Sequence, residues 1–142
     1  MIVVDTSVWV AALRSGTSRE AVVLGELLQA DEVALPTPAR TELFSGASVA
    51  DYAKLRRSLS ALPLVVPGEE TWKIVDGWVA EAVVRGQRFG FGDLVIGALA
   101  KDIGALVWSL DADFTRLERL KFVELYDPPD NAARDAGRRR SL

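Results

Sequence analysis

Histidine and cysteine are both absent from this chain of 142 residues. Without cysteine there can be no disulfide, no thiolate nucleophile and no cysteine-ligated zinc. Without histidine the chain lacks the commonest general base, the base of a serine-type triad and the usual ligands of zinc. Carboxylates are therefore the remaining candidates for catalytic acids, bases or metal ligands. Any chemistry has to use the oxygen atoms of side chains.

The sequence also lacks long apolar runs and a strong excess of charge. No uninterrupted apolar stretch approaches the ~20 residues that a membrane-spanning helix requires. The acid at Asp5, after three apolar residues, leaves no signal-peptide pattern at the start, so we expect a soluble, cytoplasmic protein. The net charge of −3 argues against a protein that coats DNA, but it permits an enzyme that binds phosphate through metal ions.

The composition predicts one folded domain followed by a polar tail. Apolar residues make up 49% of the chain and charged residues 26%, which is an ordinary balance for a globular domain. A chain of this length suits a single core. The composition turns polar after Pro128-Pro129 and ends in Arg138-Arg139-Arg140. We expect a domain over residues 1–126 and a mobile tail over residues 127–142.

Short apolar runs alternate with helical patterns along the domain. The runs predict strands at residues 2–4, 33–35, 64–66 and 105–110, with a further candidate at 122–125. The longest predicted helix covers residues 69–85, and its apolar surface is broad enough to contact a partner as well as the core. That surface has two stripes: Trp72, Val75, Val79 and Ala82 on one, Ile74 and Trp78 on the other. Because parallel neighbours need helical crossovers, the alternation predicts an α/β sandwich with a mostly parallel central sheet.

Four acids fall where the chain would leave such a sheet. Asp5 and Asp111 come directly after apolar strands, and ligands of open α/β sheets bind beyond the carboxyl ends of the strands. Glu42 lies early in the helix that follows the second strand, and Asp93 opens the buried helix that precedes the strand before Asp111. We therefore expect all four at one edge of the sheet, with Asp113 as a turn or supporting residue.

Each acid also has an ordinary structural explanation. Aspartate is favoured as a helix cap or turn residue, which suits Asp5, Asp93 and Asp111, and Glu42 suits a solvated helix surface. Convergence of the four carboxylates would destabilise the fold, because two unit charges 4 Å apart repel by about 4 kcal/mol at an effective dielectric near 20. A divalent cation would offset this repulsion, and ligands made only of oxygen favour magnesium or manganese. The chemistry indicated is hydrolysis of a phosphodiester.

Four segments together resemble a PIN domain, and more narrowly a VapC-type toxin, over roughly residues 1–126. They are Ile2-Val3-Val4-Asp5-Thr6-Ser7, Arg40-Thr41-Glu42-Leu43, the run from Gly92 to Ala100, and Ser109-Leu110-Asp111-Ala112-Asp113-Phe114. The resemblance implies a PIN-like three-layer α/β/α sandwich and an endoribonuclease that depends on Mg²⁺, or alternatively Mn²⁺. It also implies an RNA substrate, a homodimer and a VapB-type antitoxin that holds the enzyme inactive.

The resemblance assigns roles to the acids by matching motif. Asp5, Glu42, Asp93 and Asp111 form the implied catalytic quartet. Asp5 and Asp93 are the implied principal metal ligands, while Glu42 and Asp111 complete the metal shell or position water. Asp113 is an auxiliary fifth acid.

Hydroxyl and aromatic side chains accompany the acids. Thr6, Ser7 and Ser109 match family hydroxyls that orient a carboxylate or a metal-bound water, although helix capping or strand-end hydrogen bonding explains them equally well. Phe89 and Phe91 depart from the family pattern. They could stack an RNA base, but we expect at least one of them to pack in the core.

Two alternative functions stay open. The segment Asp111-Ala112-Asp113-Phe114-Thr115 also resembles the nucleophile motif of haloacid-dehalogenase-like phosphatases, but that motif normally opens its fold, and here it lies near the end of the chain. The other alternative is a catalytically silent PIN-like module that binds a partner through the apolar surface of residues 69–85. Arg88 and Arg116 are expected to be solvated rather than bound to phosphate.

Overall fold

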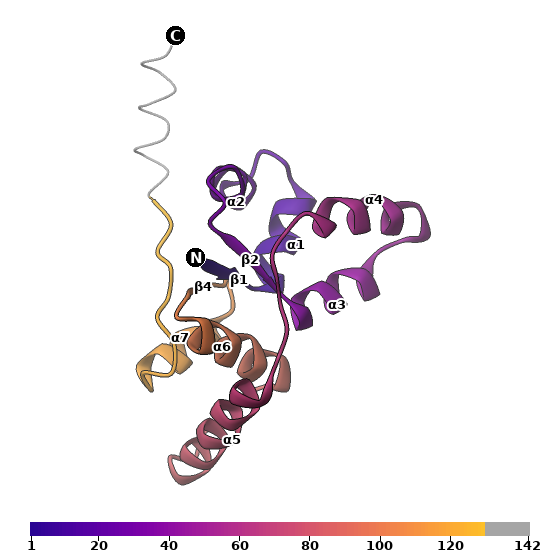
Figure 1. Cartoon of the computed structure of the whole chain (residues 1–142). Helices are drawn as coiled ribbons and strands as arrows, with labels where there is room; N and C mark the ends of the chain where they lie inside the picture. The colour runs from indigo at the N-terminus through magenta and orange to yellow at the C-terminus, as the bar shows by residue number, and fades with distance from the viewer. Residues whose placement is uncertain (130–142) are drawn as a thin grey trace.

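A parallel sheet lies at the centre of the computed structural model, which describes residues 1–129. Its four strands have the order β3-β2-β1-β4. They are β1 Ile2–Val4, β2 Val33–Pro36, β3 Leu64–Val65 and β4 Leu106–Trp108. Figure 1 labels β1, β2 and β4 at the centre of the fold. Every residue of β1 and β2 is buried, as expected for strands covered on both faces. The prediction of a mostly parallel central sheet is confirmed.

Helices cover both faces of this sheet. Within the described residues they are α1 Thr6–Arg14, α2 Arg19–Gln29, α3 Thr37–Gly46, α4 Val49–Ser60, α5 Glu69–Val84, α6 Phe91–Ile103 and α7 Ala112–Arg119. Helices α1 and α2 lie on one side of the sheet, and α5 and α6 lie on the other (Figure 1). Helices α3 and α4 project together away from the strands. The expected three-layer α/β/α sandwich is therefore confirmed.

Polar side chains fix where several helices begin. Ser18 caps α2 and Ser48 caps α4, each by accepting a backbone N–H from the first turn. Asp5 and Asp111 cap α1 and α7 in the same way. Helix α6 ends at Gly104, whose φ of 69° lies in the left-handed region that glycine adopts without a steric penalty. These caps place the first turns of α1 and α7 directly after strand β1 and shortly after strand β4.

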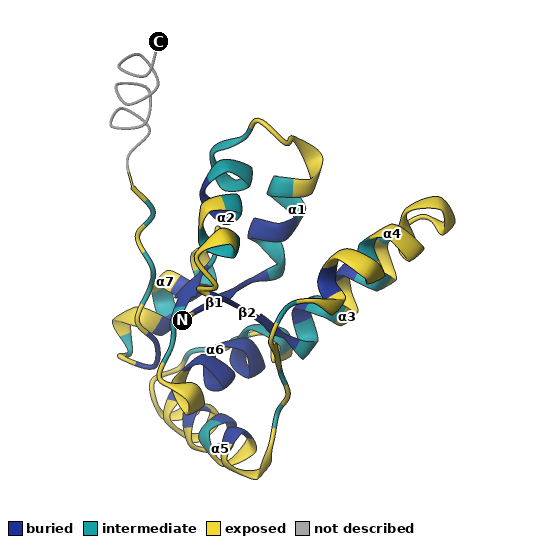
Figure 2. Cartoon of the chain, turned by 45° about the horizontal axis from the view of Figure 1, so that its top comes forward, coloured by how far each residue is buried: buried dark blue, intermediate teal, exposed yellow. Residues whose placement is uncertain are grey.

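Helix α6 is the most deeply enclosed helix, as Figure 2 shows by its dark blue turns. All its residues from Leu94 to Ala100 are buried. Helix α5 packs closely on it at Gly97, where an added Cβ would lie 3.1 Å from the Trp78 ring and 3.1 Å from Val123. The Trp78 ring in turn stacks on Phe122 with a centroid distance of 4.7 Å. This packing sets α6 close against α5 at Gly97, one turn after Asp93.

The buried face of α5 differs from the predicted stripes. The buried positions are Thr71, Val75, Trp78 and Ala82. Trp72 and Val79, which share a predicted stripe with two of them, are each 42% exposed. The Thr71 hydroxyl donates to Asp102 at 2.8 Å and accepts the Gly68 N–H at 3.1 Å. Because these bonds hold Thr71 inside, the helix turns Trp72 and Val79 outward.

The chain after β4 leaves the sheet earlier than predicted. The strand ends at Trp108 rather than at residue 110. The Leu110 N–H bonds to the hydroxyl of Ser7 at 3.0 Å, and the Asp111 N–H bonds to the hydroxyl of Ser109 at 3.0 Å. Asp111 is therefore separated from the strand by two residues whose polar groups face the end of β1.

The predicted strand at residues 122–125 is wrong. The structure has an isolated parallel bridge between Val107 and Leu125 instead. Lys121 has a φ of 62°, and the Phe122 N–H bonds back to α7, so the chain is still turning where the strand was expected to begin. Only the residues around Leu125 run beside β4.

The predicted tail is described only at its start. Arg19 donates to the carbonyl oxygens of Pro128 at 3.0 Å and Pro129 at 3.1 Å. The rest of the predicted tail, residues 130–142 with its three consecutive arginines, lies outside the described residues. Across residues 1–129, no helix combines the length and apolar character needed to cross a membrane.

Candidate metal centre

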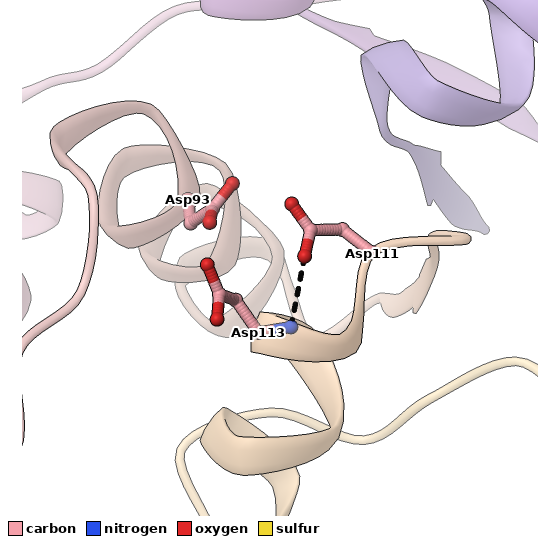
Figure 3. Close-up of side chains that lie close together, drawn as sticks. All are labelled: Asp93, Asp111 and Asp113. Carbon is pink, nitrogen blue, oxygen red and sulfur yellow. Dashed lines mark hydrogen bonds between the residues drawn. The ribbon is translucent and has the colours of Figure 1, made fainter.

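Three aspartates bring their carboxylates together where α6 and α7 begin. One oxygen from each of Asp93, Asp111 and Asp113 lies within 4.8 Å of the others, and the side chains point toward one another (Figure 3). Asp93 is the third residue of α6, Asp111 caps α7, and Asp113 is the second residue of α7. Asp111 Oδ1 accepts the Asp113 N–H at 2.9 Å, which fixes how these two neighbours face Asp93.

This convergence changes the protonation of Asp93. Its pKa is raised from the ordinary 3.8 to about 7. Burial is the largest cause, followed by the charges of Asp111, Asp5 and Asp113 and by a hydrogen bond with Asp113. Negative charge therefore accumulates at this point of the fold, and a divalent cation would reverse the sign of the local field.

Asp5 stands beside this group at the carboxyl end of β1. It is 5% exposed. Its Oδ2 accepts hydrogen bonds from the hydroxyls of Ser7 at 2.7 Å and Ser109 at 2.8 Å, and from the Ser7 N–H at 3.4 Å. Asp5 is near enough to raise the pKa of Asp93, although it is not one of the three acids within 4.8 Å of one another. The two serines hold its carboxylate toward the chain that leads to Asp111.

The hydroxyl of Thr6, the third one singled out in the sequence, has a different environment from those of Ser7 and Ser109. Thr6 Oγ1 is buried and finds no hydrogen-bond partner among residues 1–129. The structure thus joins Ser7 and Ser109 to Asp5, but it does not join Thr6 to them.

Glu42 approaches from α3. Its side chain is exposed, and a Cβ added at Gly92 would lie 3.3 Å from Glu42 Oε1. The carboxylate therefore rests against the turn of α6 that carries Asp93. Glycine at position 92 leaves room for this approach. The structure places the four predicted acids at one end of the sheet, and the fifth acid, Asp113, lies there as well.

The family follows from comparison with known proteins. A family model described as PIN domain matches residues 2–120. The chain belongs to the PIN domain family. This PIN domain is 30% identical over 119 residues to ribonuclease VapC18 of Mycobacterium tuberculosis, a match that covers 80% of this chain and 85% of that protein. It is 33% identical over 125 residues to ribonuclease VapC11 of the same species, covering 84% and 93% of the two chains.

Solved structures agree with this assignment at the level of the fold. The crystal structure of VapBC2 from Rickettsia felis, bound to a DNA fragment from its promoter, contains a chain that matches the PIN domain with a TM-score of 0.75. The sequence identity is 20%, and the match covers 89% of this chain and 98% of that one. The expected family resemblance is confirmed, and the phosphatase alternative is not favoured.

An apolar groove of about 610 Å³ opens beside the acids of the PIN domain. Its walls come mainly from α1, α3 and α4. The apolar lining includes Trp9, Leu13, Leu43, Leu55, Leu59 and Leu62. Charged side chains also line it, among them Arg14, Asp51 and Lys54. Glu42 belongs to the same lining, so the groove reaches the acidic end of the sheet.

The expectation that Arg116 is an ordinary solvated arginine was wrong. Its guanidinium donates to Asp113 Oδ1, to Gln87 Oε1 and to the carbonyl oxygen of Arg88, each at 3.0 Å. It also lies over the Phe89 ring, 4.4 Å from the centroid. The spacing of three residues between Asp113 and Arg116 on a helix was the available sequence signal, but it gave no hint of the other contacts.

The two phenylalanines before Asp93 have different environments. Phe89 packs against the core beneath Arg116, as expected for at least one of them. Phe91 is 71% exposed and stacks with Trp72 of α5 at a centroid distance of 6.0 Å. The chain before Asp93 therefore contributes one anchored ring from the loop and, from the first residue of α6, one ring that solvent can reach.

Proposed function

We propose that this PIN domain protein is a metal-dependent endoribonuclease of the VapC type, the toxin of a VapBC-type pair. The observation that carries the proposal is the meeting of Asp93, Asp111 and Asp113 beside the buried Asp5. The relatives that are 30% and 33% identical are named ribonucleases, which supports RNA as the substrate. Hydrolysis of an RNA phosphodiester is the reaction that unites these observations.

The donor set fits Mg²⁺, with Mn²⁺ as the alternative. All the converging ligand atoms are carboxylate oxygens, which magnesium prefers. Asp5, Asp93 and Asp111 would hold the ion, with Asp113 as an auxiliary ligand. The pKa of Asp93, raised first by burial and then by the neighbouring acids, supports a bound cation, because a positive charge there would favour the ionised carboxylates. When bound, the ion supplies an activated water and offsets negative charge on the scissile phosphate.

The other residues of the site orient these groups. Ser7 and Ser109 both donate to Asp5 Oδ2, so Oδ1 is the oxygen that neither hydroxyl occupies. This geometry supports a positioning role for the two serines. Glu42 is exposed and its Oε1 lies beside Gly92, the residue before Asp93, which suits it to orient water or a metal-bound water. Catalysis is then shared among acids from α3, α6, α7 and the end of β1.

The apolar groove supports an antitoxin as the regulatory partner. Solved neighbours of this fold include VapBC complexes, in which the toxin fold is accompanied by its antitoxin. We infer that an amphipathic helix of a VapB-type antitoxin packs on Trp9, Leu13 and Leu55. Because Glu42 lines the same groove, a helix bound there ends beside the proposed catalytic acids.

A homodimer is part of the same proposal. Helix α5 exposes an apolar stripe that consists of Trp72, Val79 and Val83, and the exposed Phe91 stacks against its first member. Exposed apolar surface of this extent on one helix favours burial against another protein. A second copy of the chain is the occupant that the VapC resemblance supports.

The catalytic proposal is tested by RNA cleavage with added Mg²⁺. We expect Asp5→Asn and Asp93→Asn to lower kcat by about 100-fold or more, because each removes a charged ligand oxygen. A chelator should abolish cleavage by the unaltered protein. Asp76→Asn on the exposed face of α5 is the matched control and should leave kcat unchanged. Rates like those of the unaltered protein for both site variants would rule the mechanism out.

The groove is tested by co-expression with the antitoxin gene. Leu13 is 60% exposed and lines the groove, whereas Val66 is 61% exposed and lies outside its lining. We expect Leu13→Glu to lose co-purification of the antitoxin and Val66→Glu to keep it. Equal retention by both variants would place the antitoxin elsewhere.

A further inference from the structure

The guanidinium of Arg116 connects two parts of the acidic site: Asp113 on α7 and the loop that leads to Asp93. Arg116 lies on α7, one turn after Asp113, and its Nη1 donates to Asp113 Oδ1 at 3.0 Å. Its Nη2 donates to Gln87 Oε1 and to the carbonyl oxygen of Arg88, both at 3.0 Å. Gln87 and Arg88 belong to the loop between α5 and α6. A single side chain thus bonds both to the helix that carries Asp113 and to the loop that leads to Asp93.

The loop itself is short and is fixed at its beginning. Gly86 has a φ of 67°, and the Gln87 N–H bonds to Ala82 O at 2.8 Å, which closes the end of α5. Gly90 then caps α6, and Asp93 follows three residues later. Arg116 therefore contacts this loop between the end of α5 and the first turn of α6. A displacement of the loop at Arg88 would therefore also move the first turn of α6, which carries Asp93.

Several interactions of Arg116 depend on the shape of its guanidinium. The planar group makes three hydrogen bonds while it also stacks on the Phe89 ring at 4.4 Å. A lysine ammonium could keep the charge opposite Asp113, but it could not reproduce the fork and the stacked plane. Solvation of a surface charge would need none of these contacts. Their number and direction indicate that the residue orders the groups around it.

We propose that Arg116 is a positioning residue that sets the separation between Asp93 and the Asp111–Asp113 pair by tying the α5–α6 loop to α7. This inference rests on the proposed nuclease function for its catalytic consequence, although the tie itself is a property of the fold. Ligand oxygens that share a cation have to be held within a few tenths of an ångström, and the partners that hold them affect activity by about 10- to 100-fold.

The test compares Arg116→Met, Arg116→Lys and the control Arg119→Met. Methionine keeps the apolar length of the side chain and removes every polar contact, whereas lysine retains only the charge. Arg119 is exposed on the same helix, so its replacement controls for loss of a positive charge on α7. Hydrogen exchange of residues 86–92 is measured in the metal-free full chain, and kcat and KM for RNA are measured with Mg²⁺.

We expect Arg116→Met to speed exchange in residues 86–92 by about tenfold or more, with exchange in buried α6 unchanged. We expect its kcat to fall by about 10- to 100-fold while KM changes less than about threefold. Arg116→Lys should recover kcat only in part, and Arg119→Met should match the unaltered protein. A rise in KM without a fall in kcat would assign Arg116 to RNA binding and overturn the proposal.

Two further results would also overturn it. One is exchange in residues 86–92 that Arg116→Met leaves unchanged. The other is faster exchange throughout the chain, with kcat falling only as far as the folded fraction falls, because that pattern belongs to a purely stabilising residue. If the unaltered protein fails to cleave RNA, the nuclease proposal fails, and the exchange data still decide whether Arg116 ties the loop to α7.

Discussion

Asp93 is the residue at which opposing electrostatic effects can be compared. Its place in the first turn of α6 favours a carboxylate, because the amino end of a helix carries partial positive charge, an effect of about 0.3–1 kcal/mol. Burial and the three neighbouring acids outweigh that effect, since they raise the pKa of Asp93 to about 7. In the metal-free protein near neutral pH, about half of the molecules therefore carry a protonated Asp93.

The raised pKa makes metal-free stability depend on pH. A carboxyl group whose folded pKa exceeds its unfolded value stabilises the fold below the unfolded pKa, and this contribution is lost as the pH rises through the folded pKa. For Asp93 the loss runs from about pH 4 to above pH 7. The melting temperature of the unaltered protein should therefore fall relative to that of Asp93→Asn over this range.

Calorimetry in the presence of a chelator measures this effect. Asp93→Asn should be the more stable protein at pH 8, by several degrees, and the two should converge near pH 4. Asp76→Asn provides the control for an exposed aspartate. Parallel curves for Asp93→Asn and the unaltered protein would show that Asp93 titrates normally.

Gly92 offers a separate prediction because its missing Cβ makes room for Glu42. An added methyl would lie 3.3 Å from Glu42 Oε1, so Gly92→Ala should push the carboxylate away by a few tenths of an ångström. Alanine suits a helix better than glycine, and the change in stability should stay within about 1 kcal/mol. We expect kcat for RNA to fall while the urea midpoint is maintained or rises. An unchanged kcat would show that the exact place of Glu42 does not matter.

At the scale of elements, the contact between α5 and α6 depends on one small residue. Gly97→Ala would place a methyl 3.1 Å from both Trp78 and Val123. The Trp78 ring is held by stacking on Phe122, and Val123 is buried. Overpacking of this kind costs about 1–3 kcal/mol. Gly77 on α5 has no atom within 4 Å of the corresponding position.

This pair of glycines gives opposite expectations in urea denaturation. Gly97→Ala should lower the free energy of unfolding by about 1–3 kcal/mol. Gly77→Ala should raise it by roughly 0.5–1 kcal/mol, because it only removes the entropic cost of a glycine within a helix. If Gly97→Ala were as stable as Gly77→Ala, the close approach of α5 and α6 would be excluded.

The elements also show which features a sequence can predict. Strands β1 and β2 could be predicted because short apolar runs are typical of strands buried on both faces, and the convergence of Asp5 and Asp111 follows from parallel strand direction. The early end of β4 could not be predicted, because it depends on a bond between Leu110 and Ser7, which lie 103 residues apart. The contacts of Arg116 with the α5–α6 loop could not be predicted for the same reason, since its partners there are 28 and 29 residues away.

At the scale of the whole molecule, the exposed stripe of α5 predicts the mode of self-association. Val79→Glu would place a charge in the proposed dimer interface, where it would be buried without a partner. We expect this variant to sediment as a monomer at concentrations at which the unaltered protein is a dimer. Val66→Glu, on an exposed position away from α5, should remain dimeric. A dimeric Val79→Glu variant would place the contact elsewhere.

The acids of the centre are distributed from the end of β1 to the first turn of α7, which is the last helix among the described residues. During synthesis the ribosome therefore releases Asp5, Glu42 and Asp93 well before Asp111 and Asp113. A nascent chain that stops at β4 has only part of the ligand set and none of the contacts that α7 makes with the α5–α6 loop. Under the proposed nuclease function, a chain that stops at β4 should therefore be unable to cleave RNA until α7 has been added.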